Sequence, residues 1–249
     1  PALGKTFPAE NPKLEMLANI NGIACYSLTI EENVLLRYGE RETVATIKGV
    51  DDSYVKVTGI DSAMWDGEFI LKSDKQRDYA IPGIGIANYL GIGITFITPI
   101  NIYVPKRTGG STVNAEEAFN RRFIYPSGIF QIEQSYDSKY IYVPIDFARD
   151  LIGNENGVSS VEIKFLDNAD EKRVRKEVSD LFGDDFIVQN RFEQQEIFYR
   201  VMRSERLVIF LILTLIIIIA SFNIIGSLTM LIIEKERDIS ASTLRAYLP

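Results

Sequence analysis

The most constraining feature of this sequence is an apolar stretch near its C-terminus, Leu207–Ile233, which contains no charged side chain. An α-helix of these 27 residues spans about 40 Å, whereas the hydrocarbon core of a bilayer is about 30 Å thick. Apolar side chains would cover every side of the helix, unlike the single stripe of a surface helix. A buried core helix is the alternative, but such helices are seldom this long or this uniformly apolar, and the position excludes a signal peptide. The stretch therefore predicts a transmembrane helix over residues 207–233.

Small and polar side chains interrupt the second half of this stretch, namely Ser221, Asn223, Gly226, Ser227 and Thr229. In a membrane helix, such residues allow another helix to approach closely and offer hydrogen bonds between helices. We therefore expect this helix to pack against other transmembrane helices, which a lone anchor would not need.

Charge and composition exclude several classes of function. The net charge is −7, and because three basic and three acidic residues cancel within residues 207–249, all of it lies in residues 1–206. An acidic region without a basic stripe argues against nucleic-acid binding. The chain has no histidine and a single cysteine, Cys25, so the usual zinc sites, disulfides within the chain, and Ser-His-Asp or Cys-His catalysis are excluded. No phosphate-binding Gly-x-x-x-x-Gly-Lys-Ser/Thr loop occurs, and no convincing acid–base pair stands on one element, so we expect no enzymatic activity and no cofactor in this chain.

The residues before the apolar stretch show the mixed pattern of an α+β domain. Ile23–Leu36 and Glu42–Val50 predict two strands joined by a hairpin turn, and Asp170–Phe182 predicts an amphipathic helix followed by a strand at Phe186–Gln189. Further strands are predicted at 99–104, 123–134, 139–143 and 158–165, and short helices at 12–19 and 144–152.

A glycine-rich unit lies within Asp78–Ile94, where an apolar strand enters a turn at Gly83 and Gly85, and Gly91 ends a short helix. Two glycines in this spacing could form a phosphate cradle. The dinucleotide fingerprint also needs a third glycine at the start of the helix and an acidic residue about 20 residues later, and neither is clear here. We therefore interpret the segment as a strand–turn–helix packing unit.

The most polar connector in the chain is Pro105–Arg122, which is rich in glycine and long for a hairpin loop. Long loops are often functional, and a solvated loop without a partner is the alternative interpretation.

Residues 191–206 contain neither proline nor glycine, and Ile197, Phe198, Val201 and Met202 form one apolar stripe that runs into the apolar stretch. This pattern predicts one continuous helix that leaves the domain and enters the bilayer. A continuous helix can carry a displacement across the membrane, whereas a passive tether would be expected to be a flexible Gly/Ser linker.

Three segments share a pattern with one family of membrane proteins. They are Ala220–Leu228 with the charged exit Glu234–Ile239, the glycine unit Ala80–Gly91, and Tyr140–Leu151. In these segments the chain resembles the permease subunits of type VII (MacB/FtsX-like) ABC transporters, and most closely the lipoprotein-releasing Lol permeases. The resemblance covers nearly the whole chain, although the loop Pro105–Arg122 lacks the proline-rich sequence of the Lol loop that recruits a carrier.

The resemblance implies a piece of a longer permease with four transmembrane helices. Residues 1–190 would form an extracytoplasmic MacB-like core domain, in which a porter-like α+β part, about 9–50 and 140–190, holds a β-rich insertion of about 51–139. Residues 191–206 would be a stalk helix, 207–233 the transmembrane helix, and 234–249 a truncated cytoplasmic coupling segment.

The function that the resemblance implies is transmission of ATP-driven motion to release lipoproteins from the bacterial inner membrane, with residues 1–206 outside the cytoplasm. A separate cytoplasmic ABC ATPase subunit would bind ATP and Mg²⁺. Further partners would be a second permease copy or paralogue, membrane lipid, the lipoprotein cargo and a periplasmic lipoprotein carrier. By position, coupling to the ATPase would involve Glu234, Lys235, Glu236, Arg237, Asp238 and Ile239. The candidate carrier loop would include Pro105, Lys106, Arg107, Thr108, Gly109 and Gly110, and helix packing would involve Ile197, Phe198, Val201, Met202, Asn223 and Gly226.

Two alternatives remain open. Within the family, the chain could belong to a MacB-like exporter or to an FtsX-like regulator of wall hydrolases. Outside it, the chain could be a receptor or adhesion ectodomain with one transmembrane helix, which would have no ATPase partner.

Overall fold

The computed structural model describes residues 6–73, 77–94, 97–106, 119–190, 193, 209–226, 228–233 and 235. The chain divides into two compact units, Pro1–Val188 and Gln189–Pro249. In chain order the first unit contains β1 (Phe7–Pro8), α1 (Pro12–Leu17), β2 (Ile23–Tyr38), β3 (Arg41–Val50), α2 (Tyr54–Thr58), η1 (Ile60–Ala63), β4 (Met64–Gly67), β5 (Tyr79–Pro82), α3 (Ile84–Leu90), β6 (Ile100–Pro105), β7 (Phe119–Pro126), β8 (Gly128–Phe130), α4 (Gln134–Asp137), β9 (Tyr140–Pro144), α5 (Ile145–Ile152), β10 (Gly157–Val158), β11 (Ser160–Phe165), α6 (Glu171–Phe182) and η3 (Gly183–Asp185).

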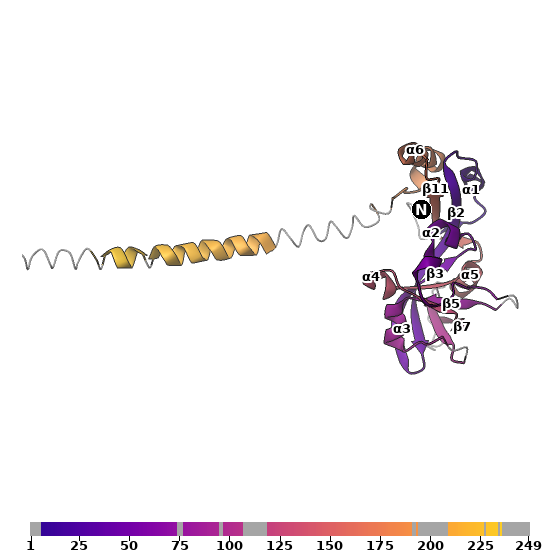
Figure 1. Cartoon of the computed structure of the whole chain (residues 1–249), viewed down its shortest axis with the longest axis horizontal. Coiled ribbons are helices and arrows are strands. Elements are labelled where there is room, and N and C mark those ends of the chain that lie inside the picture. Colours follow the sequence, from indigo (N-terminus) through magenta and orange to yellow (C-terminus); the bar gives the residue numbers. More distant parts are fainter. Residues whose placement is uncertain are drawn as a thin grey trace, which may run out of the picture. The chain divides into compact units, whose positions relative to one another are not determined.

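Six strands of the first unit pair in a closed circuit, in the order β2-β3-β9-β5-β7-β6 and back to β2. The β3–β9 and β5–β7 pairs are parallel and the other four are antiparallel. Apolar side chains of these strands, together with α3 and α5, form the main core. We call this part the barrel lobe; in Figure 1 its helices α3 and α5 lie in the lower half of the first unit.

A second, smaller lobe packs α1 and α6 against β11 and the first half of β2, at the upper end of the same unit in Figure 1. Its own core includes Leu14 and Leu17 of α1 with Val174, Val178 and Phe182 of α6. These positions recur every three or four residues, so each helix buries one stripe. We call this part the α+β lobe, and the predicted α+β class is confirmed.

Local signals account for the ends of several elements. The Asn11 side chain accepts a hydrogen bond from the Lys13 amide and Pro12 begins α1, as the sequence predicted. The Asp170 carboxylate accepts hydrogen bonds from two amides in the first turn of α6. Gly153 ends α5 in the left-handed conformation, which glycine adopts without steric cost.

The glycine unit forms a strand, a turn and a helix, as predicted. A Cβ added at Gly83 would lie 2.7 Å from Cα of Asp137, and one added at Gly85 would lie 2.9 Å from Cα of Ser138. Both glycines therefore allow the turn after α4 to pack closely against the start of α3, which is a packing role.

Three predictions about local structure are wrong. The strand predicted at 123–134 is instead the second half of β7 followed by β8, and α4 begins at Gln134. Residues Phe186–Gln189 do not form a strand; instead the Phe186 ring packs edge-to-face against Phe7 and Phe182, so side-chain burial holds the segment without strand pairing. Residues 119–122, assigned to the long connector, are the first half of β7, because they pair with β6 from Pro105 to Ile102.

Candidate functional site

The strands β6 and β7 form an antiparallel ribbon on either side of the candidate carrier loop. One face of the ribbon carries Ile100, Ile102, Val104 and Ile124, which are buried in the barrel core. On the same face, Arg122 forms an ion pair with Asp150 of α5 at 2.8 Å. Since side chains alternate along a strand, the residues between these positions point outward.

The outward face carries Tyr103, Phe119, Arg121, Phe123 and Tyr125, which we call the aromatic–arginine strip. Phe123 is 63% exposed, and its ring packs edge-to-face against that of Tyr125, with 6.3 Å between the ring centres. The Arg121 guanidinium lies 5.5 Å from the centre of the Tyr103 ring, a cation–π distance. Exposed aromatic and arginine side chains of this kind are enriched at the energetic centres of protein interfaces.

The structure places only part of the predicted loop. Pro105 ends β6 and is exposed, and Lys106 follows it directly. Arg107, Thr108, Gly109 and Gly110 lie outside the described residues. The strip was missed in the sequence, although the even spacing of the aromatic residues Phe119, Phe123 and Tyr125, which places them on one face of a strand, was a signal for it. Alternation alone does not show which face is buried.

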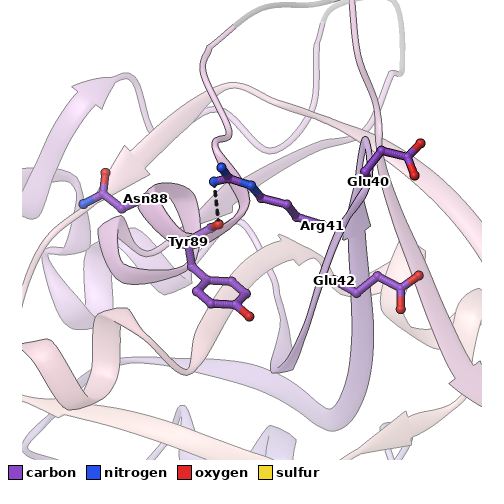
Figure 2. A pocket seen from close by; sticks show the side chains of 5 residues that line it. All are labelled: Glu40, Arg41, Glu42, Asn88 and Tyr89. Carbon is purple, nitrogen blue, oxygen red and sulfur yellow. Dashed lines mark hydrogen bonds between the residues drawn. The ribbon is translucent and has the colours of Figure 1, made fainter.

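An open hollow lies where the β2–β3 hairpin meets the end of α3 (Figure 2). It is lined by Glu40, Arg41, Glu42, Asn88 and Tyr89. The Arg41 guanidinium donates a hydrogen bond to the Tyr89 carbonyl oxygen at 3.1 Å, which fastens the hairpin to α3. Among the described residues, no three acidic or thiol side chains gather closely enough to hold a metal ion.

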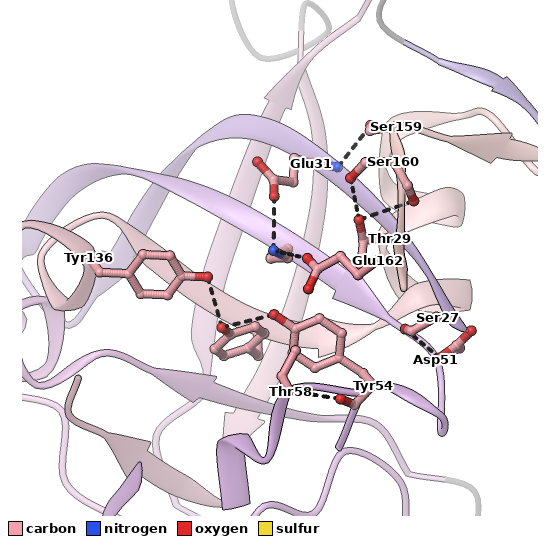
Figure 3. Close-up of polar contacts among 12 residues, drawn as sticks. Ser27, Thr29, Glu31, Asp51, Tyr54, Thr58, Tyr136, Ser159, Ser160 and Glu162 are labelled. Atoms are coloured by element: carbon pink, nitrogen blue, oxygen red, sulfur yellow. Dashed lines mark hydrogen bonds and ion pairs between the residues drawn. The ribbon is translucent and has the colours of Figure 1, made fainter. Parts of the chain in front are cut away.

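A buried lysine, Lys48, contacts Glu31 of β2 and Glu162 of β11, the two carboxylates labelled in Figure 3. Lys48 of β3 is only 7% exposed, and its ammonium lies 2.6 Å from a Glu162 carboxylate oxygen and 3.2 Å from one of Glu31. The rings of Tyr54 and Tyr140 lie 5.4 and 5.9 Å from the same ammonium. Burial by itself lowers the pKa of Lys48, but the electrostatic effect of its neighbours, Glu162 foremost, more than offsets burial, so the pKa is raised and Lys48 stays charged.

Three tyrosine hydroxyls form a chain beside this lysine. The Tyr142 hydroxyl lies 2.9 Å from that of Tyr136 and 3.3 Å from that of Tyr54. Burial raises the pKa of the Tyr142 and Tyr54 phenols, so both remain protonated and able to donate. The sequence shows a lysine inside an apolar strand, which was a signal for a buried charge, but it does not show the partners.

The second unit contains an apolar helix, Ile209–Ile233, which is long and apolar enough to cross a membrane by length and composition. The hydroxyls of Thr214, Ser221 and Thr229 each donate to the carbonyl oxygen four residues earlier, at 2.8 Å. These hydroxyls therefore have partners within their own helix, while Asn223 and Gly226 stand exposed on it. Of the predicted coupling residues, Lys235 is described and Glu234, Glu236, Arg237, Asp238 and Ile239 lie outside the described residues. The predicted stalk residues Ile197, Phe198, Val201 and Met202 also lie outside them.

Known proteins resemble this chain in sequence and in fold. No protein-family model matches the chain. The lipoprotein-releasing system transmembrane protein LolC of Neisseria meningitidis serogroup B is 26% identical over 165 residues, which cover 64% of this chain and 38% of that protein. The chain thus spans well under half the length of this relative.

Two solved structures have a similar fold. The extracellular domain of the noncanonic ABC-type transporter YknZ from Gram-positive bacteria superposes with a TM-score of 0.52 and 17% identity, covering 74% of this chain and 86% of that domain. The periplasmic region of MacB from Actinobacillus actinomycetemcomitans superposes with a TM-score of 0.52 and 14% sequence identity, and the match covers 75% of this chain and 81% of that region. The predicted MacB-like fold of the first unit is confirmed.

Proposed function

Because this chain is related to the MacB/FtsX-like permeases of ABC transporters, we propose that it carries ATP-driven motion across the inner membrane to release lipoproteins. The observation that supports lipoprotein release is the sequence similarity to a LolC protein. The shared fold supports the permease class but not the cargo, because proteins of one fold perform different functions.

In this proposal, ATP hydrolysis takes place on a separate subunit, and the charged exit Glu234–Ile239 receives its motion. Residues 191–233 carry the motion to the extracytoplasmic domain. Residues 1–206 lie on the outer side, and a second permease subunit packs against the apolar helix through the exposed Asn223 and Gly226.

The energy requirement explains why such a machine consumes ATP. Each buried methylene of an acyl chain contributes about 0.8 kcal/mol to membrane retention. A protein with several acyl chains therefore leaves the bilayer very slowly unless its extraction is coupled to hydrolysis.

We assign the docking of a soluble lipoprotein carrier to the aromatic–arginine strip together with the loop that begins at Pro105. The strip presents Phe123 and Arg121 on a domain whose overall charge is negative, so it offers a local cationic and apolar surface. A carrier surface with acidic side chains around an apolar patch would complement it.

The test uses the full-length permease, reconstituted in a bilayer with its candidate ATPase. ATP hydrolysis is recorded with and without a triacylated lipoprotein and a soluble carrier. Hydrolysis stimulated by lipoprotein, with transfer to the carrier, supports the proposal. An ATPase that binds but ignores lipoprotein favours a MacB-like exporter or an FtsX-like regulator, which the fold similarity to MacB supports equally well. Absence of ATPase binding favours an anchored ectodomain.

Two variants test the strip within the same assay. Arg121→Glu and Phe123→Ser should reduce transfer to the carrier without reducing ATP hydrolysis. Matched controls change exposed residues of the α+β lobe, Lys176→Glu and Leu166→Ser. Equal transfer by all four variants would remove the strip from the mechanism.

A further inference from the structure

The two lobes of the first unit have their own apolar cores, which meet at the partly buried Leu28, and one strand, β2, runs through both. Residues Ile23–Thr29 of β2 pair with β11 in the α+β lobe, while Thr29–Tyr38 pair with β3 in the barrel lobe. Thr29 is the crossing point, because it lies opposite both Ser160 of β11 and Val50 of β3. The α+β lobe is also the one whose last helix, α6, precedes the second unit in the chain.

Polar contacts, rather than apolar packing, hold the lobes together on one face of β2. The Thr29 hydroxyl lies 2.7 Å from that of Ser160, and the Glu31 amide donates to the Ser159 hydroxyl at 3.0 Å. The Ser27 hydroxyl donates to a carboxylate oxygen of Asp51, which follows β3, at 2.7 Å. We call this row of contacts the polar seam (Figure 3).

Lys48 lies beside the polar seam, and its side chain also reaches from one lobe to the other. It lies directly opposite Glu31 on β2, whereas Glu162 lies opposite Ser27, on the far side of that strand. Its ammonium therefore crosses β2 to contact β11, a strand with which β3 does not pair. The contact joins residues 114 positions apart in the sequence.

We propose that Lys48, Glu31 and Glu162 form a clasp that holds the α+β lobe and the barrel lobe in one orientation, so that motion delivered to the first reaches the aromatic–arginine strip on the second. The proposal rests on the proposed function for the source of that motion. Lys48 is a positioning residue, since it acts through the orientation of the lobes.

The physical reason lies in what a buried ion pair does well. Well-packed apolar side chains often stabilise a protein as much as a buried ion pair does. A gain in net stability therefore does not explain why Lys48, Glu31 and Glu162 form an ion pair at this place. An ion pair has directional partners, however, and removing one member leaves a charge buried without compensation. Sliding of β11 along β2 would separate Lys48 from Glu162 and break their ion pair. An apolar contact at the same place has no directional partner, so it would tolerate such sliding.

Distances between spin labels in the full-length chain test the clasp without nucleotide or ATPase. Cys25 is changed to serine, and labels are attached at Lys176→Cys on α6 and Asn88→Cys on α3, both exposed. We expect one narrow distance distribution for the otherwise unchanged protein and a broadened one for Lys48→Met. Lys72→Met is the matched control, because Lys72 pairs with Asp146 at 2.7 Å but both side chains are exposed.

A second variant keeps the proposal falsifiable if Lys48→Met does not fold. Glu162→Gln removes the charge on β11 but leaves Lys48 paired with Glu31, and it should broaden the distribution to a smaller extent. A folded Lys48→Met or Glu162→Gln protein with the unchanged, narrow distribution overturns the clasp.

The reconstituted transporter separates a clasp from a merely structural residue. Lys48→Met should keep ATP hydrolysis while release per ATP falls roughly fivefold or more, the size of a typical coupling between sites. Equal losses of both activities would indicate a folding defect and overturn the positioning role. If the unchanged protein neither binds an ATPase nor releases lipoprotein, the proposed function fails, while the distance measurement still decides on the clasp.

Discussion

Replacement of Gly83 by alanine tests the close packing of the glycine unit. The backbone of Gly83 has an ordinary extended conformation, with φ of −68°, so alanine causes no backbone strain there. The cost must come from the added Cβ, which would lie 2.7 Å from both Cα and the carbonyl carbon of Asp137. The Asp137 carbonyl oxygen would lie closer still, and ordinary contact begins at 3.4 Å, so the two segments must separate by more than 0.7 Å.

Neither segment is free to move. Asp137 is 2% exposed, and its carboxylate accepts a hydrogen bond from the Ile132 amide at 2.8 Å. On the other side, the Gly83 amide donates to the Tyr140 carbonyl oxygen at 3.1 Å. Overpacking of a rigid site costs about 1–3 kcal/mol, and we expect the upper end of this range. For a domain of this size, about 3 kcal/mol lowers Tm by about 6–12 °C.

The measurement is thermal unfolding of the full-length chain in detergent, followed by circular dichroism. Gly93→Ala is the matched control, because a Cβ at Gly93 would meet no atom within 4 Å and should leave Tm nearly unchanged. If Gly83→Ala unfolds at the same temperature as the Gly93→Ala control, the close approach to Asp137 does not constrain the fold, and the packing argument is refuted.

Three further predictions concern pH, a helix cap and the apolar helix. Lys48, Tyr54 and Tyr142 have raised pKa values in the folded state, so above their ordinary values of 10.5, 10.0 and 10.0 the unfolded chain loses protons that the folded chain keeps. The free energy of unfolding that these groups contribute should therefore be fully present at neutral pH and fall as pH rises beyond about 10. The fall should be less steep in Tyr142→Phe, and denaturant titrations at several pH values measure both. Asp170→Ala should cost about 1 kcal/mol and speed hydrogen exchange in the first turn of α6, and normal exchange there would contradict the capping role. Gly226→Leu should weaken association of the helix with its partner in a bilayer, and undiminished energy transfer between labelled subunits would place the interface elsewhere.

Local sequence was sufficient wherever a few neighbouring residues decide the structure. The run Leu207–Ile233 predicts a membrane-crossing helix from length and polarity alone, and the structure has an apolar helix there. The hairpin of β2 and β3, the capped start of α1 and the glycine turn before α3 were also predictable, because turn, cap and alternation signals act over a few residues. The same locality misled at Phe186–Gln189, where an apolar run suggested a strand but the side chains fill the α+β core instead.

Contacts between distant segments were decided only by the tertiary structure. Lys48 could be recognised as a charge in an apolar strand, but Glu162 becomes its partner because β2 brings β11 and β3 to its two edges. Likewise, Phe123 faces outward because Ile124 is held in the barrel core by the pairing of β7 with β6. Strand register reverses every side chain when it shifts by one residue, and register depends on long-range pairing. For that physical reason the sequence indicated most of the elements and the resemblance to a family, whereas only the fold brought Lys48 to Glu162 and turned Phe123 outward.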